Sequence, residues 1–157
     1  MKNVANTAML AIALVTSTLA QAQTFDQSVA AAERGDNGTA LTGFKNLAEK
    51  GHAKSQFNLG VIYRNGQGVP ADDQLAMAWY RKAADQGDAA AQYNVGEMYR
   101  NGQGVDKEDQ TAYYWLLLAS TQGHLNAARN RDFLVRRLTP EQRAAVEVAV
   151  RNWKAKT

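Results

Sequence analysis

An internal repeat without gaps constrains this chain more than any other feature of its sequence. Residues 53–88 and 89–124 align at a period of 36 residues, and 18 of these 36 positions are identical. The segment Tyr63–Val69 recurs unchanged as residues 99–105. Self-similarity at a fixed period of this length is typical of proteins built from stacked supersecondary units. The chain is therefore expected to fold as an array of stacked repeats.

Each repeat has the pattern of two helices. The first helix has one face at the spacing i, i+3, i+4, i+7. Its members in the first repeat are Gln56, Leu59, Gly60 and Tyr63. Asn65 and Gly66 predict the end of this helix, since glycine adopts the left-handed conformation common at helix C-termini. Asp72 and Asp73 predict the start of the second helix, whose positive dipole end favours carboxylates, and Gly87 predicts its end. The sequence therefore predicts an all-α fold, an α-solenoid of antiparallel helix pairs.

Small residues recur at fixed places and predict how the helices pack. Gly60 and Gly96 lie in the middle of a helix, where glycine costs about 1 kcal/mol relative to alanine. Their recurrence indicates close approach of a second helix. The expected partners are the alanines of that helix, Ala76, Ala83, Ala112 and Ala119. Trp79 and Trp115 are expected to supply the bulk between the layers.

The flanks of the repeats are expected to cap the array. Residues 23–52 are interpreted as a degenerate N-terminal repeat, with a first helix over 25–34, a short loop over 35–38 and a second helix over 39–52. Residues 125–157 are interpreted as capping helices. Thr139 and Pro140 begin the last one, with Gln142 placed to complete a capping box. Its apolar stripe is expected to comprise Val146, Ala149, Val150 and Trp153. These helices are expected to bury Leu117 and Leu118, which replace two basic residues of the first repeat.

Residues 1–22 are interpreted as a signal peptide. Lys2 is followed by an uncharged, largely apolar stretch over 8–19 and then by Ala20-Gln21-Ala22, a small-x-small cleavage pattern. We expect cleavage after Ala22 and a periplasmic or secreted protein with no transmembrane segment after cleavage. Uncleaved anchoring is the main alternative. The chain has no cysteine, so we expect neither a lipid anchor of the lipoprotein type nor stabilisation by disulfides.

The sequence predicts no catalytic, cofactor-binding or metal-binding residues. His52 and His124 are two repeat periods apart, which is poor geometry for a shared metal or a catalytic pair, and they are interpreted as structural turn residues. The repeated Asn-Gly-Gln-Gly-Val segment lacks the strand and the Gly-Lys-Ser/Thr of a phosphate-binding loop. The adjacent carboxylates 72/73 and 108/109 diverge on a helix, so they do not form an acid–base pair. We therefore do not expect an enzyme.

The repeat resembles a known family. The pattern Ala-x-x-Gln-(Phe/Tyr)-Asn-(Leu/Val)-Gly-x-x-Tyr-x-Asn-Gly-x-Gly-Val, followed by Ala-x-x-Trp and Ala-x-x-x-Gly, resembles the Sel-one-like repeat, which is related to tetratricopeptide repeats. The resemblance is strong over residues 53–124 and weak over 37–52. It implies a tetratricopeptide-like superhelix that acts as a scaffold, regulator or assembly factor through protein–protein contacts. Without cysteine, the chain is unlike the cysteine-rich branch of this family.

The resemblance also implies where a partner would bind. In tetratricopeptide-like stacks, the first helices line the concave surface. The corresponding positions are Lys54, Phe57, Val61, Arg64, Ala90, Tyr93, Glu97, Arg100 and Arg129. An aromatic, a basic and a variable position at helical spacing suit a peptide with acidic groups. The alternative is that Phe57 and Tyr93 are core residues, as aromatic residues at helical spacing often are.

Charge leaves the function hypotheses open. Residues 23–128 carry 9 basic and 12 acidic side chains, a net charge of −3, whereas residues 129–157 carry 8 and 3, a net charge of +5. The leading hypothesis is an exported adaptor or scaffold that binds a protein partner in the cell envelope, with a regulatory or assembly role. One alternative is a module that binds an anionic glycan or surface through the C-terminal arginines, although such a charge cluster can also be a solvated helix face. A β-lactamase-like hydrolase is a weaker alternative because no nucleophile–base pair is apparent. Nucleic acid is not an expected partner.

Overall fold

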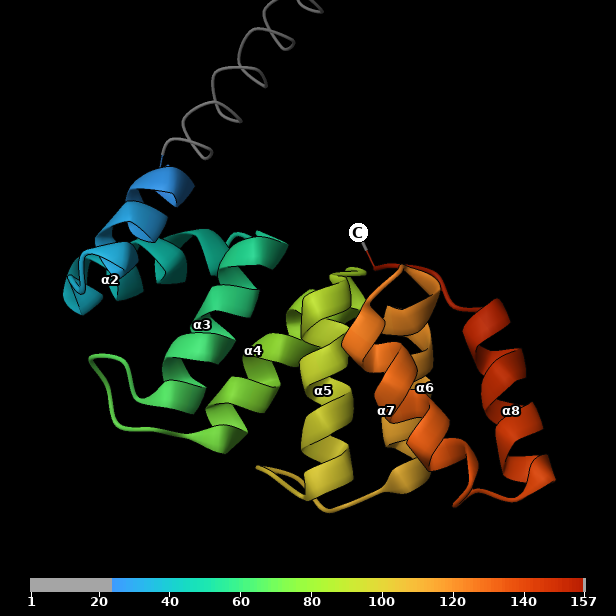
Figure 1. Ribbon diagram of the computed structural model, residues 1–157. Coiled ribbons are helices and arrows are strands. Elements are labelled where there is room, and N and C mark those ends of the chain that lie inside the picture. Colours follow the sequence, from blue (N-terminus) through green and yellow to red (C-terminus); the bar gives the residue numbers. More distant parts are fainter. Residues whose placement is uncertain (1–23, 157) are drawn as a thin grey trace, which may run out of the picture.

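The computed structural model describes residues 24–156, and every regular element in that range is a helix (Figure 1). Residues 24–33 form one helix. The others are α2 (Asn37–Ala48), α3 (Ala53–Asn65), α4 (Asp73–Asp85), α5 (Ala89–Asn101), α6 (Asp109–Thr121), α7 (Leu125–Val135) and α8 (Pro140–Arg151). The predicted all-α solenoid is confirmed. The predicted signal peptide lies outside the described residues. Within residues 24–156, no helix is both long and apolar enough to cross a membrane.

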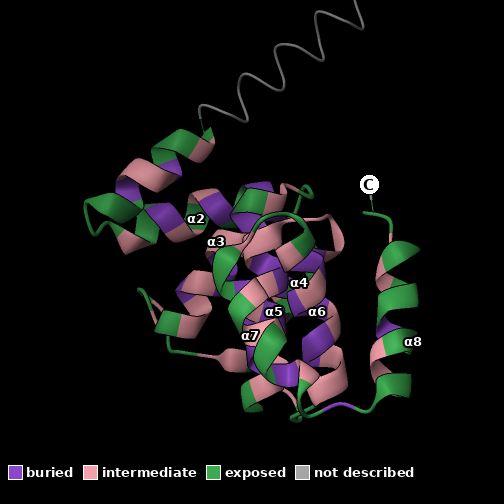
Figure 2. Ribbon diagram, turned by 45° about the vertical axis from the view of Figure 1, so that its right-hand side comes forward, coloured by how far each residue is buried: buried purple, intermediate pink, exposed green. Residues whose placement is uncertain are grey.

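Each helix from α2 to α6 packs against the next, so the helix pairs follow one another across the molecule (Figure 1). Three groups of buried side chains lie along this stack. One joins residues 24–48 to α3, one joins α4 and α5 to α6, and one joins α6 to α7 and α8. Buried residues are concentrated in α3 to α6, while α8 is mostly exposed (Figure 2). The core is therefore a row of junctions between successive helices.

The predicted close approach at the mid-helix glycines is confirmed, but its expected partners were wrong. A Cβ atom on Gly60 would lie 2.5 Å from the ring of Tyr80, and one on Gly96 would lie 2.7 Å from Cγ of Leu116. The nearest atoms thus belong to a large side chain of the second helix, not to its alanines. A glycine leaves a flat patch on the helix surface on which such a side chain can lie. Burial raises the pKa of Tyr80 to about 12, consistent with this tight enclosure.

The two tryptophans have different environments. Trp115 is buried among residues of α4 and α5. Trp79 is only half-buried, against the N-terminal group of side chains, and the ammonium of Lys82 lies 3.8 Å from its ring centroid. The expectation that both fill the space between layers therefore holds for Trp115 only, because a lysine rather than a further helix covers the outer side of Trp79.

The N-terminal repeat differs from the prediction at its loop. Helix α2 begins at Asn37, not at Thr39, because Oδ1 of Asp36 accepts a hydrogen bond from the backbone N–H of Thr39 at 3.1 Å. A hydrogen bond with the Thr39 side chain and, second, this backbone contact lower the pKa of the exposed Asp36 carboxyl. An N-terminal carboxylate cap of this kind extends the helix back into the expected loop.

The C-terminal cap forms as the sequence predicts at its start. Thr139 and Gln142 make a full capping box, with Pro140 at the first helical position. Leu118 is buried beside Val150 and Trp153, as expected, whereas Leu117 is half-buried. Ala149 is exposed and does not belong to the buried stripe, because α8 makes its contacts through positions 146 and 150, and Trp153 follows just after the helix ends. After α8 the chain returns to α4, where the Lys156 N–H donates to the Asp85 carbonyl at 2.8 Å.

A buried glutamine spans each junction between repeats. Nε2 of Gln56 donates to the Ala48 carbonyl at 3.0 Å, and its Oε1 accepts from Gln86 at 2.7 Å. Gln92 repeats the arrangement with Ala84 at 3.2 Å and Gln122 at 2.7 Å. Each glutamine thereby connects the end of the preceding second helix to the end of its own repeat. A buried amide is stable only when its groups are paired, which explains why both glutamines are identical in the repeat.

We predict that Gly60→Ala destabilises the fold despite the better helix propensity of alanine. The added Cβ would overlap the buried ring of Tyr80, and overpacking of this kind costs about 1–3 kcal/mol. Denaturant unfolding followed by circular dichroism measures the loss. Gly38→Ala is the matched control, since a Cβ there meets only Oδ1 of Asp36, at 4.0 Å, and it should be neutral or stabilising. Equal effects of the two variants would contradict the packing argument.

We also predict that Gln92→Leu lowers the free energy of unfolding by about 1–3 kcal/mol, because Gln122 and the Ala84 carbonyl each lose a buried partner. Thermal and denaturant unfolding check this value. Gln74→Leu on the exposed side of α4 is the control and should stay within about 0.5 kcal/mol of the parent. A fully stable Gln92→Leu protein would show that the junction does not need the glutamine.

Candidate interaction face

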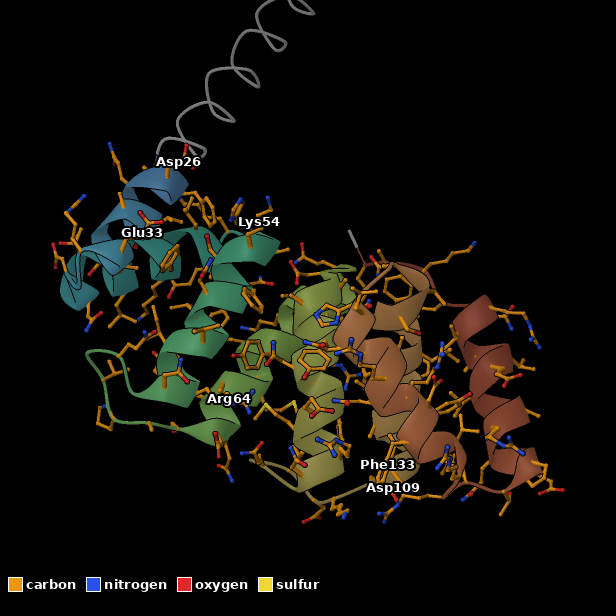
Figure 3. The ribbon with its side chains drawn as sticks, viewed as in Figure 1. Asp26, Glu33, Lys54, Arg64, Asp109 and Phe133 are labelled. Atoms are coloured by element: carbon orange, nitrogen blue, oxygen red, sulfur yellow. The ribbon has the colours of Figure 1, made fainter. Side chains whose placement is uncertain are left out.

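The outward side chains of α3, α5 and α7 form what we call the first-helix face. Figure 3 shows Lys54 near the start of α3, Arg64 near its end and Phe133 on α7. The positions predicted for partner binding differ in exposure. Lys54 and Arg129 are exposed, and Glu97 is buried. The remaining predicted positions are half-buried, namely Phe57, Val61, Arg64, Ala90, Tyr93 and Arg100.

Arg64 connects two repeats. Its Nη1 donates to Oδ1 of Asn94 at 2.9 Å, and its Nη2 donates to Oε1 of Gln103 at 3.4 Å. Asn94 is itself held by a hydrogen bond from its Nδ2 to the Ala90 carbonyl at 2.9 Å. The guanidinium of Arg64 therefore has a structural use at the junction of the two repeats. Replacing this residue would test the junction and partner binding at once.

Arg100, one period later, has a different partner. Its Nε donates to Oε1 of Glu97 at 2.9 Å, three residues earlier on α5. The hydrogen bond that Arg100 donates to Glu97 raises the pKa of Arg100. The equivalent of Glu97 in the first repeat is Val61, which offers no acceptor, so Arg64 reaches forward to Asn94 instead. The pairing with Glu97 neutralises much of the charge that Arg100 would present to an acidic ligand.

The two predicted aromatic residues contact the core on one side. The ring centroids of Phe57 and Tyr80 are 5.7 Å apart, and those of Tyr93 and His124 are 4.5 Å apart with the rings stacked. Burial raises the pKa of Tyr93. Both residues remain half-buried. They thus combine the two roles that the sequence left open, a core contact and a partly accessible surface.

The two histidines begin helices. Nδ1 of His52 accepts the backbone N–H of Ser55 at 3.2 Å, and Nδ1 of His124 accepts that of Ala127 at the same distance. Asp88 occupies the equivalent position between them, with Oδ1 accepting the N–H of Ala91 at 2.8 Å. All three are N-caps. Within residues 24–156, no group of three or more His, Cys, Asp or Glu side chains could hold a metal ion.

The sequence prediction missed three exposed residues at α7. They are Leu125 and Phe133 in the helix and Arg136 at its C-cap, on the same side as Arg129. The period of 36 maps Glu97 to Phe133 and Arg100 to Arg136. The sequence prediction continued the row only to Arg129, because the identity of the repeat disappears after residue 124.

Three cavities of the described chain lie away from the residues predicted to bind a partner. One of about 510 Å³ lies between the start of α6 and the turn before α8, one of about 450 Å³ lies between the turn before α3 and the end of α4, and one of about 370 Å³ lies between residues 24–33 and α2. None of the three is lined by any of the residues predicted to bind a partner. Most of the residues predicted to bind a partner are thus exposed or half-buried on the first helices, outside these cavities.

Comparison with known proteins follows the same boundaries. Residues 53–88 and 89–124 each match the family described as Sel1 repeat. A crystal structure of a protective antigen present in uropathogenic Escherichia coli strains, described as displaying an SLR fold, is similar with 32% identity and a TM-score of 0.78, over 85% of this chain and 29% of that one. A Sel1 repeat protein from Oxalobacter formigenes is similar with 29% identity and a TM-score of 0.67, over 70% of this chain and 45% of that one. This chain thus spans less than half the length of either protein. No curated protein is significantly similar to it.

The N-cap at His52 predicts loss of stability in acid. Burial first, and the charge of Lys54 second, lower the pKa of His52 below its usual 6.5. Only the neutral ring accepts the Ser55 N–H, so this stabilisation is present above about pH 6.5 and is lost as the pH falls through that value towards the lower folded pKa. We expect His52→Asp, which copies Asp88, to reduce the fall in melting temperature between pH 7.5 and 5.5. The cap is worth about 1 kcal/mol.

Thermal unfolding of both proteins across this pH range measures the effect. His124, the other histidine N-cap, is unchanged in both proteins, so the difference between their melting curves reports on position 52 alone. The groups around residue 52 are Lys54, Ser55 and the ring of Phe25, whose centroid is 5.0 Å from the imidazole. Identical pH dependence in parent and variant would show that the His52 cap does not titrate with folding.

Proposed function

The chain is a Sel1-like repeat protein, and from this premise we propose that it is a binding scaffold that holds a protein partner on its first-helix face. Sel1 repeat proteins are in general helical scaffolds for protein–protein contacts and not enzymes. We further propose that this scaffold acts as an adaptor in the cell envelope, in a regulatory or assembly role.

One observation carries this proposal. The residues that hold the junctions together are identical in the two repeats, namely Gln56 and Gln92, and Gly60 and Gly96. Several positions on the first-helix face instead differ, as in Lys54/Ala90/Asn126 and Val61/Glu97/Phe133, although Arg64 and Arg100 are identical. A position that packing does not determine is free to serve recognition. The first-helix face therefore stands on junctions that are the same in both repeats, while several of its outward side chains differ from one repeat to the next.

The alternatives have less support. For a glycan-binding patch, Arg131 and Arg137 are already paired with Asp132 and Asp109 at N–O distances of 2.6 Å, so two of the C-terminal arginines have reduced charge to offer. For a hydrolase, the histidines would have to act as bases. In the described chain both accept backbone N–H groups as N-caps, which occupies the nitrogen that a base would use.

The envelope location rests on residues 1–22, which have the pattern of a signal peptide. The similar Escherichia coli protein is a protective antigen, and a surface or envelope location for this chain would be consistent with that description of its relative.

We predict that a photo-crosslinking amino acid at position 54 or 129 captures one discrete partner protein in cells. The side chains at both positions are exposed and make no hydrogen bond or ion pair within residues 24–156 that a replacement would break. Crosslinked bands from the full-length chain, identified by mass spectrometry, provide the measurement. Position 64 is unsuitable because Arg64 holds the junction to Asn94.

The control is the same crosslinker at position 78, which is exposed on α4 and lies on a second helix. The proposal expects capture at 54 and 129 but not at 78. Capture only at 78, or no capture at either first-helix position, would overturn it. Fractionation of the same cells tests the location, since retention in the cytoplasm would contradict the envelope role.

A further inference from the structure

Helix α7 presents an apolar and basic stripe to the outside. Leu125 is 75% exposed and Phe133 is 54% exposed, although both are large hydrophobic residues. Arg129 and Arg136 are exposed as well. These four residues are spaced i, i+4, i+8, i+11, which places them within one sector of the helix surface. Apolar and basic side chains therefore alternate along a single line.

The opposite side of α7 anchors it to the fold. Ala127 and Leu134, seven residues apart, are fully buried against α6 and α8. The stripe is thus not a poorly packed part of the core. It lies on the side of α7 opposite to the side that already packs against α6 and α8.

The two arginines of the stripe are free, unlike their neighbours. Arg131 pairs with Asp132, and Arg137 pairs with Asp109 and lies 5.9 Å from the Phe133 ring centroid. Among residues 24–156, Arg129 and Arg136 have neither an ion pair nor a side-chain hydrogen bond. Two of the basic residues that give residues 129–157 their net positive charge therefore lie on the stripe with no internal acid of the described chain to compensate them.

We propose that the outward face of α7 binds an amphipathic helical segment of a protein partner, with acidic residues interleaved among large apolar side chains. This inference rests on the proposed scaffold function and specifies the chemistry of its partner. From Leu125 to Arg136 the stripe is about 16 Å long, which matches about three turns of a docked helix. Leu125 and Phe133 would provide the apolar contacts, and Arg129 and Arg136 would pair with the acids.

The alternation favours such a peptide over other anionic partners. An anionic glycan offers no large apolar side chains for Leu125 and Phe133. A helix that binds a lipid surface has its apolar residues on one face and its basic residues on the flanks, whereas here both kinds share one line. Charge complementarity to the two arginines thus calls for acidic residues in the partner. The exposed Leu125 and Phe133 call for large apolar residues between those acids.

The test is selection from a displayed library of random 16-residue peptides against the full chain. We expect enrichment of sequences with Asp or Glu and Leu, Ile or Phe at i, i+3 and i+4 spacing. Synthetic copies of the enriched peptides should bind about tenfold more weakly to Arg129→Glu/Arg136→Glu and to Phe133→Ala. Binding should also weaken as salt is raised.

Two matched variants control for charge and for loss of an apolar group. Arg151→Glu/Lys154→Glu makes the same charge change on exposed residues elsewhere, and Leu75→Ala removes an exposed leucine of α4. Both should bind the peptides within about twofold of the parent. Circular dichroism establishes that all variants fold, and the exposed positions make this the expected result.

Enrichment of neutral or basic peptides, or of none, would overturn the inference. So would binding to vesicles of anionic phospholipid without any peptide binding, or a dimer in analytical ultracentrifugation that the Phe133→Ala change abolishes. Peptides whose binding is lost with Lys54→Glu but retained by both α7 variants would leave the scaffold function standing and disprove the α7 site. Peptide binding unaffected by any first-helix change would contradict both.

Discussion

The structure depends on a buried glutamine at each junction between repeats. Gln56 and Gln92 each donate to a carbonyl at the end of the preceding second helix and accept from the glutamine that ends their own repeat. A glutamine amide has both a donor and an acceptor, so one side chain can bind in two directions. Because an unpaired amide in this position would be costly, the hydrogen bonds set the spacing of one repeat on the next more narrowly than apolar contacts alone.

This junction also determines which side chains remain available for binding. Arg64 and Arg100 occupy equivalent positions, yet the first reaches forward to Asn94 and the second turns back to Glu97. The difference follows from one position at which the two repeats differ. Three residues before the arginine, the first repeat has Val61 and the second has Glu97. Two of the basic side chains of the first-helix face are therefore engaged in hydrogen bonds within the protein. In the described part of the chain, the basic side chains without such partners lie at the two ends of the face, at Lys54 and on α7.

The exposed stripe of α7 follows from how the solenoid ends. In the interior of the stack, each first helix is followed by a second helix that continues the array. After α7 the chain makes a short turn, and α8 packs mainly against α6, where Leu118, Val150 and Trp153 meet. Capping therefore protects the apolar surface of α6 and leaves the outer side of α7 uncovered. At the C-terminal end of the array, α8 covers the apolar surface of α6, and the outer side of α7 remains accessible to a partner.

The sequence by itself determined the fold class, the two complete repeats, the helix ends at Gly66 and Gly102, and the capping box at Thr139, because period, turn chemistry and caps act over a few residues. It also indicated close approach at Gly60 and Gly96. Only the tertiary structure decided that Tyr80 and Leu116 fill those sites, that Glu97 is buried, and that Phe133 is exposed. These outcomes depend on which helix lies opposite each side chain, and local spacing carries no information about the partner across a junction or about where the array stops being covered.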